Sequence, residues 1–194
     1  MDTAVVSALY LPPVELLRLW CTHQEILVDI EERWIKQTLR NRTYILGANG
    51  VQSLSVPVIH TGGLPVKMKD IRISYSQPWV RVHKGALFSA YNTSPYFEYF
   101  RDDLFHELDK KPEFLIDLNL NLLQLLLKKG RYTGKTGLLS DQPYEIDYKQ
   151  FSDNDNFISA VPPAASYPQV FSYKFPFIPH LSAIDCLSNL GRIV

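Results

Sequence analysis

The stretch that decides the fold runs from Trp34 to Val58 and reads WIKQTLRNRTYILGANGVQSLSVPV. Cationic and amide side chains crowd its beginning; with the preceding arginine they are Arg33, Lys36, Gln37, Arg40, Asn41 and Arg42. An apolar run, a Gly-Ala-Asn-Gly turn and an alternating segment follow, and the alternation predicts a strand with one buried face. The sequence therefore predicts a cationic loop held between ordered elements, which suits the binding of an anion. We call residues 33–42 the basic loop.

Length and composition indicate one globular domain. The chain has 194 residues, 46% of them apolar, and a domain of this size buries roughly 70% of its unfolded surface without needing disulfides. Its cysteines, Cys21 and Cys186, lie far apart in the sequence. The first residues lack the positive charge of a signal peptide, and no run of about 18 apolar residues occurs. We therefore expect a soluble, cytoplasmic protein without a membrane span.

The net charge is zero, but the charged residues are unevenly distributed. Residues 1–97 hold ten Lys and Arg against seven Asp and Glu, whereas residues 98–194 hold ten against thirteen. Nucleic-acid-binding domains usually carry a strong basic excess on one face. The composition therefore argues against a nucleic-acid partner, and it allows a local positive pocket in the N-terminal half.

Residues 1–30 predict a strand, a helix and a second strand. Ala4–Leu9 is apolar enough for a buried strand, and a helix with Pro13 in its first turn follows. Ile26–Val28 is the second strand. This order favours a βαβ unit, so the segment from Asp29 to Arg42 should leave the carboxyl end of a strand, where open α/β sheets bind ligands. We expect a single α/β domain with a mixed β-sheet and surrounding helices; an α+β arrangement is the alternative.

Further along the chain, strict alternation over Asp70–Tyr75 predicts a strand, and Trp79–Tyr91 has the spacing of a helix. Ser94, followed by a proline, predicts the start of the next helix. Glu113–Lys129 is the most regular helix, with one narrow polar stripe on an otherwise apolar surface. Asn119 lies off that stripe, so its amide should find a hydrogen-bond partner in the interior.

The last third of the chain is less regular. Residues 130–166 carry glycine, aspartate and proline throughout, which predicts a long loop or a lid. Residues 167–194 are apolar and aromatic enough to pack back onto the body of the domain. A final helix should begin near Ser182, with Asp185 at the spacing of a capping box and Gly191 at the C-terminal end.

Four sequence blocks follow one another in a recognisable order. They are Tyr10–Pro13 (YLPP); Lys36–Arg42 (KQTLRNR) running to Leu54–Val58 (LSVPV); His83 through Tyr91 to Pro95–Phe100 (PYFEYF); and Phe177–Asp185 (FIPHLSAID). In order and spacing they resemble the WbqC-like protein family of bacteria, in the short form typical of Bacteroides relatives. The resemblance covers nearly the whole chain except residues 130–163, and four ordered blocks are more specific than any one of them.

The resemblance implies a role in the assembly of surface polysaccharide. Members of the family tend to be encoded with genes for that pathway, and amino-acid (glycyl) transfer onto a sugar is suggested for some. We therefore expect an enzyme of O-antigen-like polysaccharide biosynthesis that carries out aminoacyl or acyl transfer to an anionic, nucleotide-sugar-like precursor. A non-catalytic module that binds such a precursor or a partner enzyme is the alternative. Ser7-Ala8 replaces a Gln-Pro frequent in the family, and the glycine-containing middle segment of longer members has no counterpart.

The basic loop supplies the candidate binding residues. Arginine offers a planar fork to carboxylate or phosphate, lysine offers a point charge, and amides add donors and acceptors. We expect the anion to be held by Lys36, Arg40, Asn41 and Arg42, with Trp34 able to stack on a sugar. A solvated basic face, a structural arginine–carboxylate pair, and pairing with the acidic second half are the alternatives.

His83 is the candidate catalytic base, because imidazole titrates near neutral pH. A hydrogen-bonded histidine at the edge of the core is the alternative. If the catalytic assignment holds, His83, Lys36 and Arg42 should converge. We expect no metal and no cofactor, because the five histidines are scattered and no glycine-rich phosphate-binding motif occurs.

Overall fold

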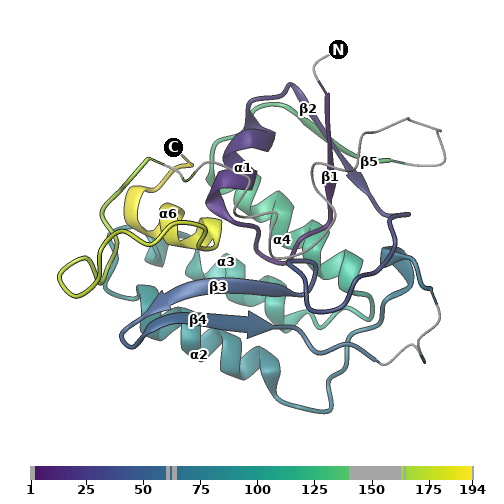
Figure 1. Ribbon diagram of the computed structural model, residues 1–194, viewed down its shortest axis with the longest axis horizontal. Helices are drawn as coiled ribbons and strands as arrows, with labels where there is room; N and C mark the ends of the chain where they lie inside the picture. Colours follow the sequence, from purple (N-terminus) through teal and green to yellow (C-terminus); the bar gives the residue numbers. More distant parts are fainter. Residues whose placement is uncertain (1–2, 60–61, 63–64, 140–162, 164, 194) are drawn as a thin grey trace.

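A βαβ unit opens the fold, in agreement with the sequence (Figure 1). In the computed structural model, which describes residues 3–59, 62, 65–139, 163 and 165–193, β1 (Thr3–Ser7) and β2 (Glu25–Asp29) are parallel neighbours joined through α1 (Val14–Cys21). β5 (Lys135–Leu139) pairs with the other side of β2, also in parallel, and gives the order β1-β2-β5. Asp29 lies opposite both Ser7 and Leu139, so all three strands end at one edge.

The quoted stretch forms an antiparallel hairpin of β3 (Arg42–Gly47) and β4 (Gly50–Ser55). Gly47 pairs with Gly50, so Ala48 and Asn49 make the turn. Gly50 has a φ of 109°, a conformation that only glycine adopts without strain. The parallel sheet and the hairpin together confirm the predicted α/β class with mixed strand directions.

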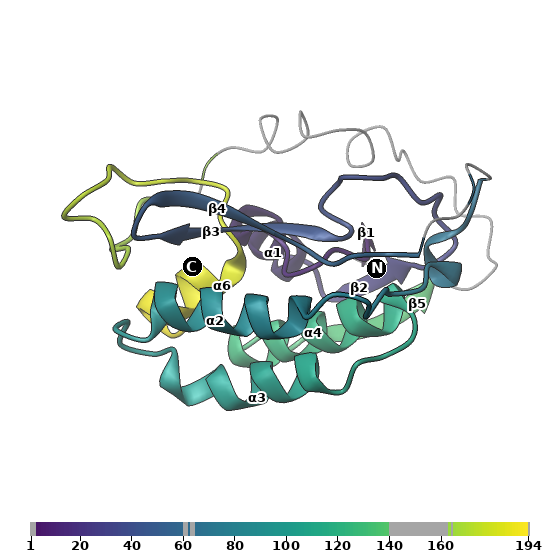
Figure 2. The same ribbon diagram turned by 90° about the horizontal axis from the view of Figure 1, so that it is seen from below.

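Three helices form a layer beneath the strands, which Figure 2 shows from the side. They are α2 (Trp79–Tyr91), α3 (Glu98–Asp109) and α4 (Leu115–Lys129). α4 contributes most to the core among these helices: Leu115, Leu118 and Leu122 are fully buried. It packs against α3, against α6 (Ala183–Leu190) and against the short 3-10 helix η1 (Met68–Asp70). No helix in the described part of the chain is long and apolar enough to cross a membrane.

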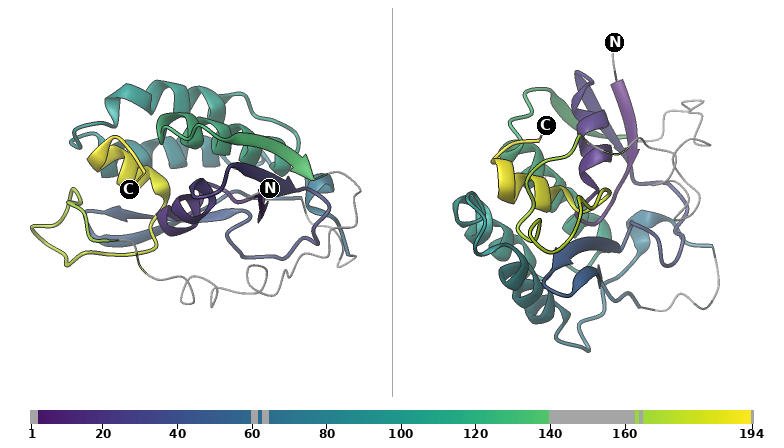
Figure 3. Two further views of the ribbon diagram at one scale, coloured as in Figure 1. Left: turned by 90° about the horizontal axis from the view of Figure 1, so that it is seen from above. Right: turned by 60° about the vertical axis from the view of Figure 1, so that its left-hand side comes forward.

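The C-terminal segment returns to the body of the protein, where α6 lies against α1 and α4 (Figure 3). Ala183, Ile184 and Leu187 are buried in the main core. The Ser182 hydroxyl accepts a hydrogen bond from the Ile184 N–H at 3.3 Å, and Gly191 ends the helix with a φ of 68°. This is the predicted cap at each end of the final helix.

Some predicted elements differ from the structure. Asp70–Tyr75 is not a strand: its first residue ends η1, and Arg72 and Ile73 make isolated bridges to Phe114 and Val58, because no continuous strand of the described residues lies beside them. Ser94 does not begin α3, which starts at Glu98; its hydroxyl instead donates to the Tyr91 carbonyl at 2.5 Å and closes the end of α2.

The segment 130–166, which the sequence predicts to be a loop, contains β5. This strand is short and contains a glycine, so its sequence shows no clear strand pattern. β5 forms because β2 offers it a hydrogen-bonding edge, a tertiary effect that periodicity does not reveal. The greater part of the expected lid, residues 140–162 and 164, lies outside the described residues.

Candidate functional site

The basic loop leaves β2 at the carboxyl edge of the parallel sheet and returns to begin β3. Several backbone hydrogen bonds hold it there: the Trp34 N–H donates to the Val66 carbonyl at 2.9 Å, and the Tyr10 N–H donates to the Leu39 carbonyl at 2.9 Å. Gln37 has a φ of 59°, which is uncommon for a residue with a side chain. The loop is therefore an ordered structure placed where parallel sheets bind ligands.

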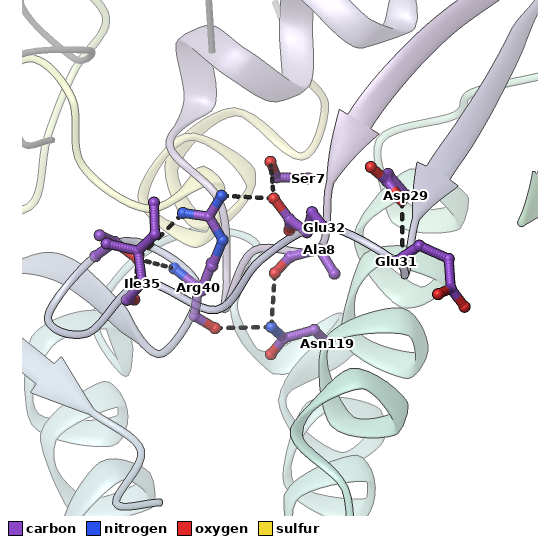
Figure 4. A network of polar contacts seen from close by, with 9 residues as sticks. Ser7, Ala8, Asp29, Glu31, Glu32, Ile35, Arg40 and Asn119 are labelled. Carbon is purple, nitrogen blue, oxygen red and sulfur yellow. Dashed lines mark hydrogen bonds and ion pairs between the residues drawn. The ribbon is translucent and has the colours of Figure 1, made fainter. Parts of the chain in front are cut away.

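Arg40 is the anchor of the loop (Figure 4). Its Nη2 lies 2.5 Å from Glu32 Oε2, and both side chains are more than nine-tenths buried. Ser7, the last residue of β1, donates its hydroxyl to the same carboxylate oxygen at 2.9 Å. Arg40 thus forms the structural arginine–carboxylate pair that the sequence left open, and it fixes the loop against the strand end.

This anchor retains unused hydrogen-bonding capacity. Glu32 Oε1 and Arg40 Nε are buried and have no hydrogen-bond partner within the described part of the chain. Burial raises the pKa of Glu32, and Asp29 adds to the rise, while Arg40 and Ser7 oppose it. A buried network in which some atoms stay unpaired costs stability, and such costs concentrate at functional sites.

Two asparagine side chains, Asn119 and Asn41, also hold the basic loop in place by hydrogen bonds. Asn119 of α4 donates its amide to the carbonyls of Ala8 at 2.9 Å and of Arg40 at 2.8 Å. This confirms the interior hydrogen-bond partner predicted for Asn119, and it shows what the amide does: it ties α4 to both the β1–α1 segment and the basic loop (Figure 4). Asn41 donates to the Val56 carbonyl at 2.9 Å and so ties the loop to the hairpin.

His83 lies at the edge of the core and is 3% exposed. Its Nδ1 is 2.8 Å from the Tyr10 hydroxyl, and its ring meets the Trp79 ring edge-on. Burial lowers the pKa of His83 to about 4, although the Ser55 carbonyl opposes this shift. The imidazole is therefore neutral at pH 7, and its hydrogen-bonded place in the core matches the structural alternative. The catalytic role remains a prediction.

The backbone that follows Tyr10, the hydrogen-bond partner of His83, has an unusual conformation. The next residue, Leu11, has a φ of 46° and is fully buried, which is strained for a bulky side chain. The Leu11 carbonyl accepts a hydrogen bond from Thr43 at 2.8 Å and so holds this conformation in place.

The other predicted site residues, Arg42, Lys36 and Trp34, differ in their contacts and in their burial. Arg42 donates its Nε to the Ser55 hydroxyl at 3.1 Å, and the Ser55 carbonyl also interacts with His83. Arg42 and His83 therefore contact different groups of the same residue of β4. Lys36 is exposed on the loop, and no described contact brings its ammonium to them. Trp34 is 8% exposed and packs in the core, which leaves little of its ring for stacking on a sugar.

A buried acid in α6 belongs to a second polar cluster. Asp185 is 1% exposed and accepts a hydrogen bond from Gln169 Nε2 at 3.0 Å. Burial raises its pKa, while the nearby Tyr167, Gln169 and Tyr91 side chains oppose the shift. The predicted capping box is wrong for this residue, because the Ser182 N–H donates to the Tyr44 carbonyl instead. A carboxylate inside the apolar run AIDCL is the sequence signal that points to this burial.

The described residues hold no group of three or more His, Cys, Asp or Glu that could bind a metal ion. The model of the WbqC-like protein family matches residues 8–134. The chain belongs to the WbqC-like protein family. That match covers the basic loop, His83 and Asn119 of this WbqC-like chain, and it ends before β5. No curated protein and no solved structure matches the chain.

Proposed function

We propose that this WbqC-like chain binds an anionic sugar precursor of surface-polysaccharide biosynthesis at the basic loop. Positive charge that has no carboxylate partner among the described residues carries the proposal. Among the ion pairs between described residues, Arg40 is the loop cation with a carboxylate partner, whereas Arg33, Lys36 and Arg42 have none. The described acids of the second half that form ion pairs do so elsewhere, for example Asp109 with Lys84 and Glu113 with Arg72.

The anchored loop supports such binding in a simple way. The Arg40–Glu32 pair and the Asn119 amide fix the backbone, so the loop that carries the neighbouring cations is ordered before any ligand arrives. Arg42 uses its Nε on Ser55, which leaves its terminal nitrogens for a carboxylate or phosphate. An anion would relieve the repulsion between these cations and add charge-assisted hydrogen bonds of roughly 1.5–3 kcal/mol each.

The family supplies the class of ligand. Its members tend to be encoded with genes for surface-polysaccharide assembly, whose activated precursors carry phosphate and often carboxylate. An ordered cationic loop at the carboxyl edge of a parallel sheet suits such a molecule.

Thermal unfolding with added ligand tests the proposal. A nucleotide sugar at about a hundred times its dissociation constant should stabilise the fold by ~2.7 kcal/mol, and the gain should shrink at high salt. Lys36→Gln combined with Arg42→Gln should remove most of it. Arg101→Gln is the matched control, because Arg101 pairs with Asp102 on α3 away from the loop. No shift with any anionic sugar, or a shift that survives the double substitution, would make the loop a solvated face.

Aminoacyl or acyl transfer is the second candidate function, and the contacts that His83 and Arg42 each make with Ser55 favour it. In that reaction a sugar hydroxyl or amine attacks the acyl carbon, gives its proton to a base, and the donor's leaving group departs with the bonding electrons. A neutral imidazole can accept that proton. His83 and its hydrogen-bond partner Tyr10 are both buried, so the reaction requires a local movement that exposes the imidazole to the substrate.

A transfer assay separates the two functions. The chain would be incubated with an activated glycine ester and a nucleotide sugar, and the product measured by mass spectrometry. An enzyme should form the glycyl sugar in the wild type, lose it in His83→Gln, and still bind the sugar in that variant. No product from the wild type, with ligand binding intact, would support the binding module.

A further inference from the structure

A cavity of about 500 Å³ lies away from the basic loop, between the start of α2 and the end of α3. The two helices run in opposite directions, so the N-terminus of α2 and the C-terminus of α3 lie at the same end of the helix layer (Figure 2). Tyr75 and Pro78 line one side of the cavity, and Asp109 and Lys111 line the other. Its volume falls within the roughly 300–1,000 Å³ of small-molecule sites.

The cavity carries a positive charge. Its lining includes three cations and one acid, which are Arg81, Lys84, Lys111 and Asp109. Lys84 Nζ lies 2.6 Å from Asp109 Oδ2, so these two charges compensate each other. Arg81 and Lys111 have no ion pair with a described residue. Two cations from different parts of the chain therefore line one cavity without an ion-pair partner among the residues that the structure describes.

The backbone at the start of α2 adds hydrogen-bond donors to this charge. Pro78 precedes the helix, no side chain caps it, and its first turn carries no acidic residue. Trp79 and Val82 donate to the carbonyls of Gln77 and Pro78, but no backbone acceptor in the described chain takes the N–H groups of Val80 and Arg81. Both of these residues line the cavity. Such donors favour an anion placed beside the cationic side chains.

An aromatic ring gives the cavity an apolar wall. Tyr75 stacks on Trp79 with ring centroids 5.8 Å apart and planes 27° apart. Its hydroxyl donates to the Pro112 carbonyl at 2.8 Å, which fixes the ring between α2 and the α3–α4 connection. Tyr75 is still 36% exposed, so the side not covered by Trp79 is open to a ligand. A flat base or the apolar face of a sugar suits such a surface.

We propose that this cavity is a second ligand site, and that it binds an organic phosphate. Arg81 and Lys111 hold the phosphate, and the ring of Tyr75 packs against the sugar or base attached to it. This site is independent of the proposed function, because it shares no residue with the basic loop. A nucleoside diphosphate and a sugar phosphate carry the same recognised groups, and the experiment distinguishes them.

Isothermal titration calorimetry of the full chain tests the proposal. The probes are uridine diphosphate, glucose 1-phosphate, inorganic phosphate and uridine. We expect saturable binding of at least one organic phosphate, weaker binding of inorganic phosphate, and none of uridine. Arg81→Gln combined with Lys111→Gln should weaken that binding by about a hundredfold, at about tenfold for each cation. Lys110→Gln is the matched control, because Lys110 pairs with Glu107 and does not line the cavity.

Further variants distinguish the contribution of the Tyr75 ring from that of the cations. They also distinguish binding at this site from binding at the basic loop. Tyr75→Phe should keep binding, whereas Tyr75→Ala should weaken the organic phosphate and leave inorganic phosphate unchanged. Lys36→Gln with Arg42→Gln should leave the affinity unchanged. The proposal is overturned if neither organic phosphate binds, if the Arg81 and Lys111 variant binds equally well while remaining folded, or if the loop variant abolishes binding.

Discussion

Asn119 joins three segments of the chain through one amide group. The carbonyls that it satisfies belong to Ala8 and Arg40, and both residues are at least 96% buried. Asn119→Ala leaves both carbonyls without a donor, and we expect it to lower the free energy of unfolding by about 2–4 kcal/mol. Urea denaturation measures this loss. Asn121→Ala on the same helix is the control and should cost little; equal losses in the two variants would show that the bridge is unimportant.

His83 should make stability depend on pH. Its pKa falls from 6.5 to about 4 on folding, so the unfolded chain binds the proton more readily. The free energy of unfolding should therefore rise between pH 4 and pH 6.5, by up to about 3 kcal/mol, and be fully gained at neutral pH.

His83→Asn should flatten this pH dependence, and chemical denaturation at several pH values measures it. His106→Asn, at an exposed position of α3, should keep the slope of the parent protein. The burial account of His83 fails if both variants show the same pH dependence.

Single residues also show which contacts can be predicted from the sequence and which cannot. The polar interruption at Asn119 predicts an interior partner, because a lone amide in an apolar surface needs one. The sequence alone does not single out the pairing of Arg40 with Glu32, because that pairing depends on how the basic loop folds over the end of β1. The spacing of Asp185 from Ser182 predicts a cap, whereas its hydrogen-bond partner in the structure is Gln169, which only tertiary packing brings close.

α6 is the element that closes the core. Ile184, Cys186 and Leu187 are at most 1% exposed, and the helix packs on both α1 and α4. Deleting residues 168–194 should therefore abolish cooperative unfolding, because the faces of α1 and α4 lose their cover. A truncated chain that melts at the parent temperature would contradict this role.

A point substitution gives a milder test of the same element. Leu187→Ala should cost about 2–5 kcal/mol, because a buried leucine leaves a cavity. Leu190→Ala, at a half-buried position, should cost clearly less. Circular dichroism during heating compares the two, and equal losses would speak against the burial argument.

Elements with a regular spacing of apolar residues were predictable from the sequence. Elements that form only by pairing with a neighbouring strand were not. The apolar spacing of Trp79–Tyr91 gave the bounds of α2, and the βαβ order gave the parallel pairing of β1 with β2. β5 escaped prediction because five residues containing a glycine show little periodicity until β2 is beside them. Asp70–Tyr75 alternates like a strand, yet it finds only isolated bridges.

In the whole molecule, the basic loop lies at the carboxyl edge of the parallel sheet. The sequence predicted this placement, because a strand that ends at Asp29 must deliver the following loop to its carboxyl edge. It also predicted that His83, Lys36 and Arg42 converge. Arg42 and His83 contact different groups of Ser55, nothing described joins Lys36 to them, and the common site remains a prediction. A long, flexible side chain on the surface of a loop has no position that a sequence pattern can fix.

The central claim is that the basic loop holds an anionic sugar precursor. A crystal structure of the chain grown with a nucleotide sugar tests it most directly. The account predicts that the anionic group of the ligand lies within hydrogen-bond distance of Arg42 and Lys36, with the Arg40–Glu32 pair unchanged beneath it. A ligand bound elsewhere in the molecule with the loop left empty, even in the cavity between α2 and α3, would contradict the claim.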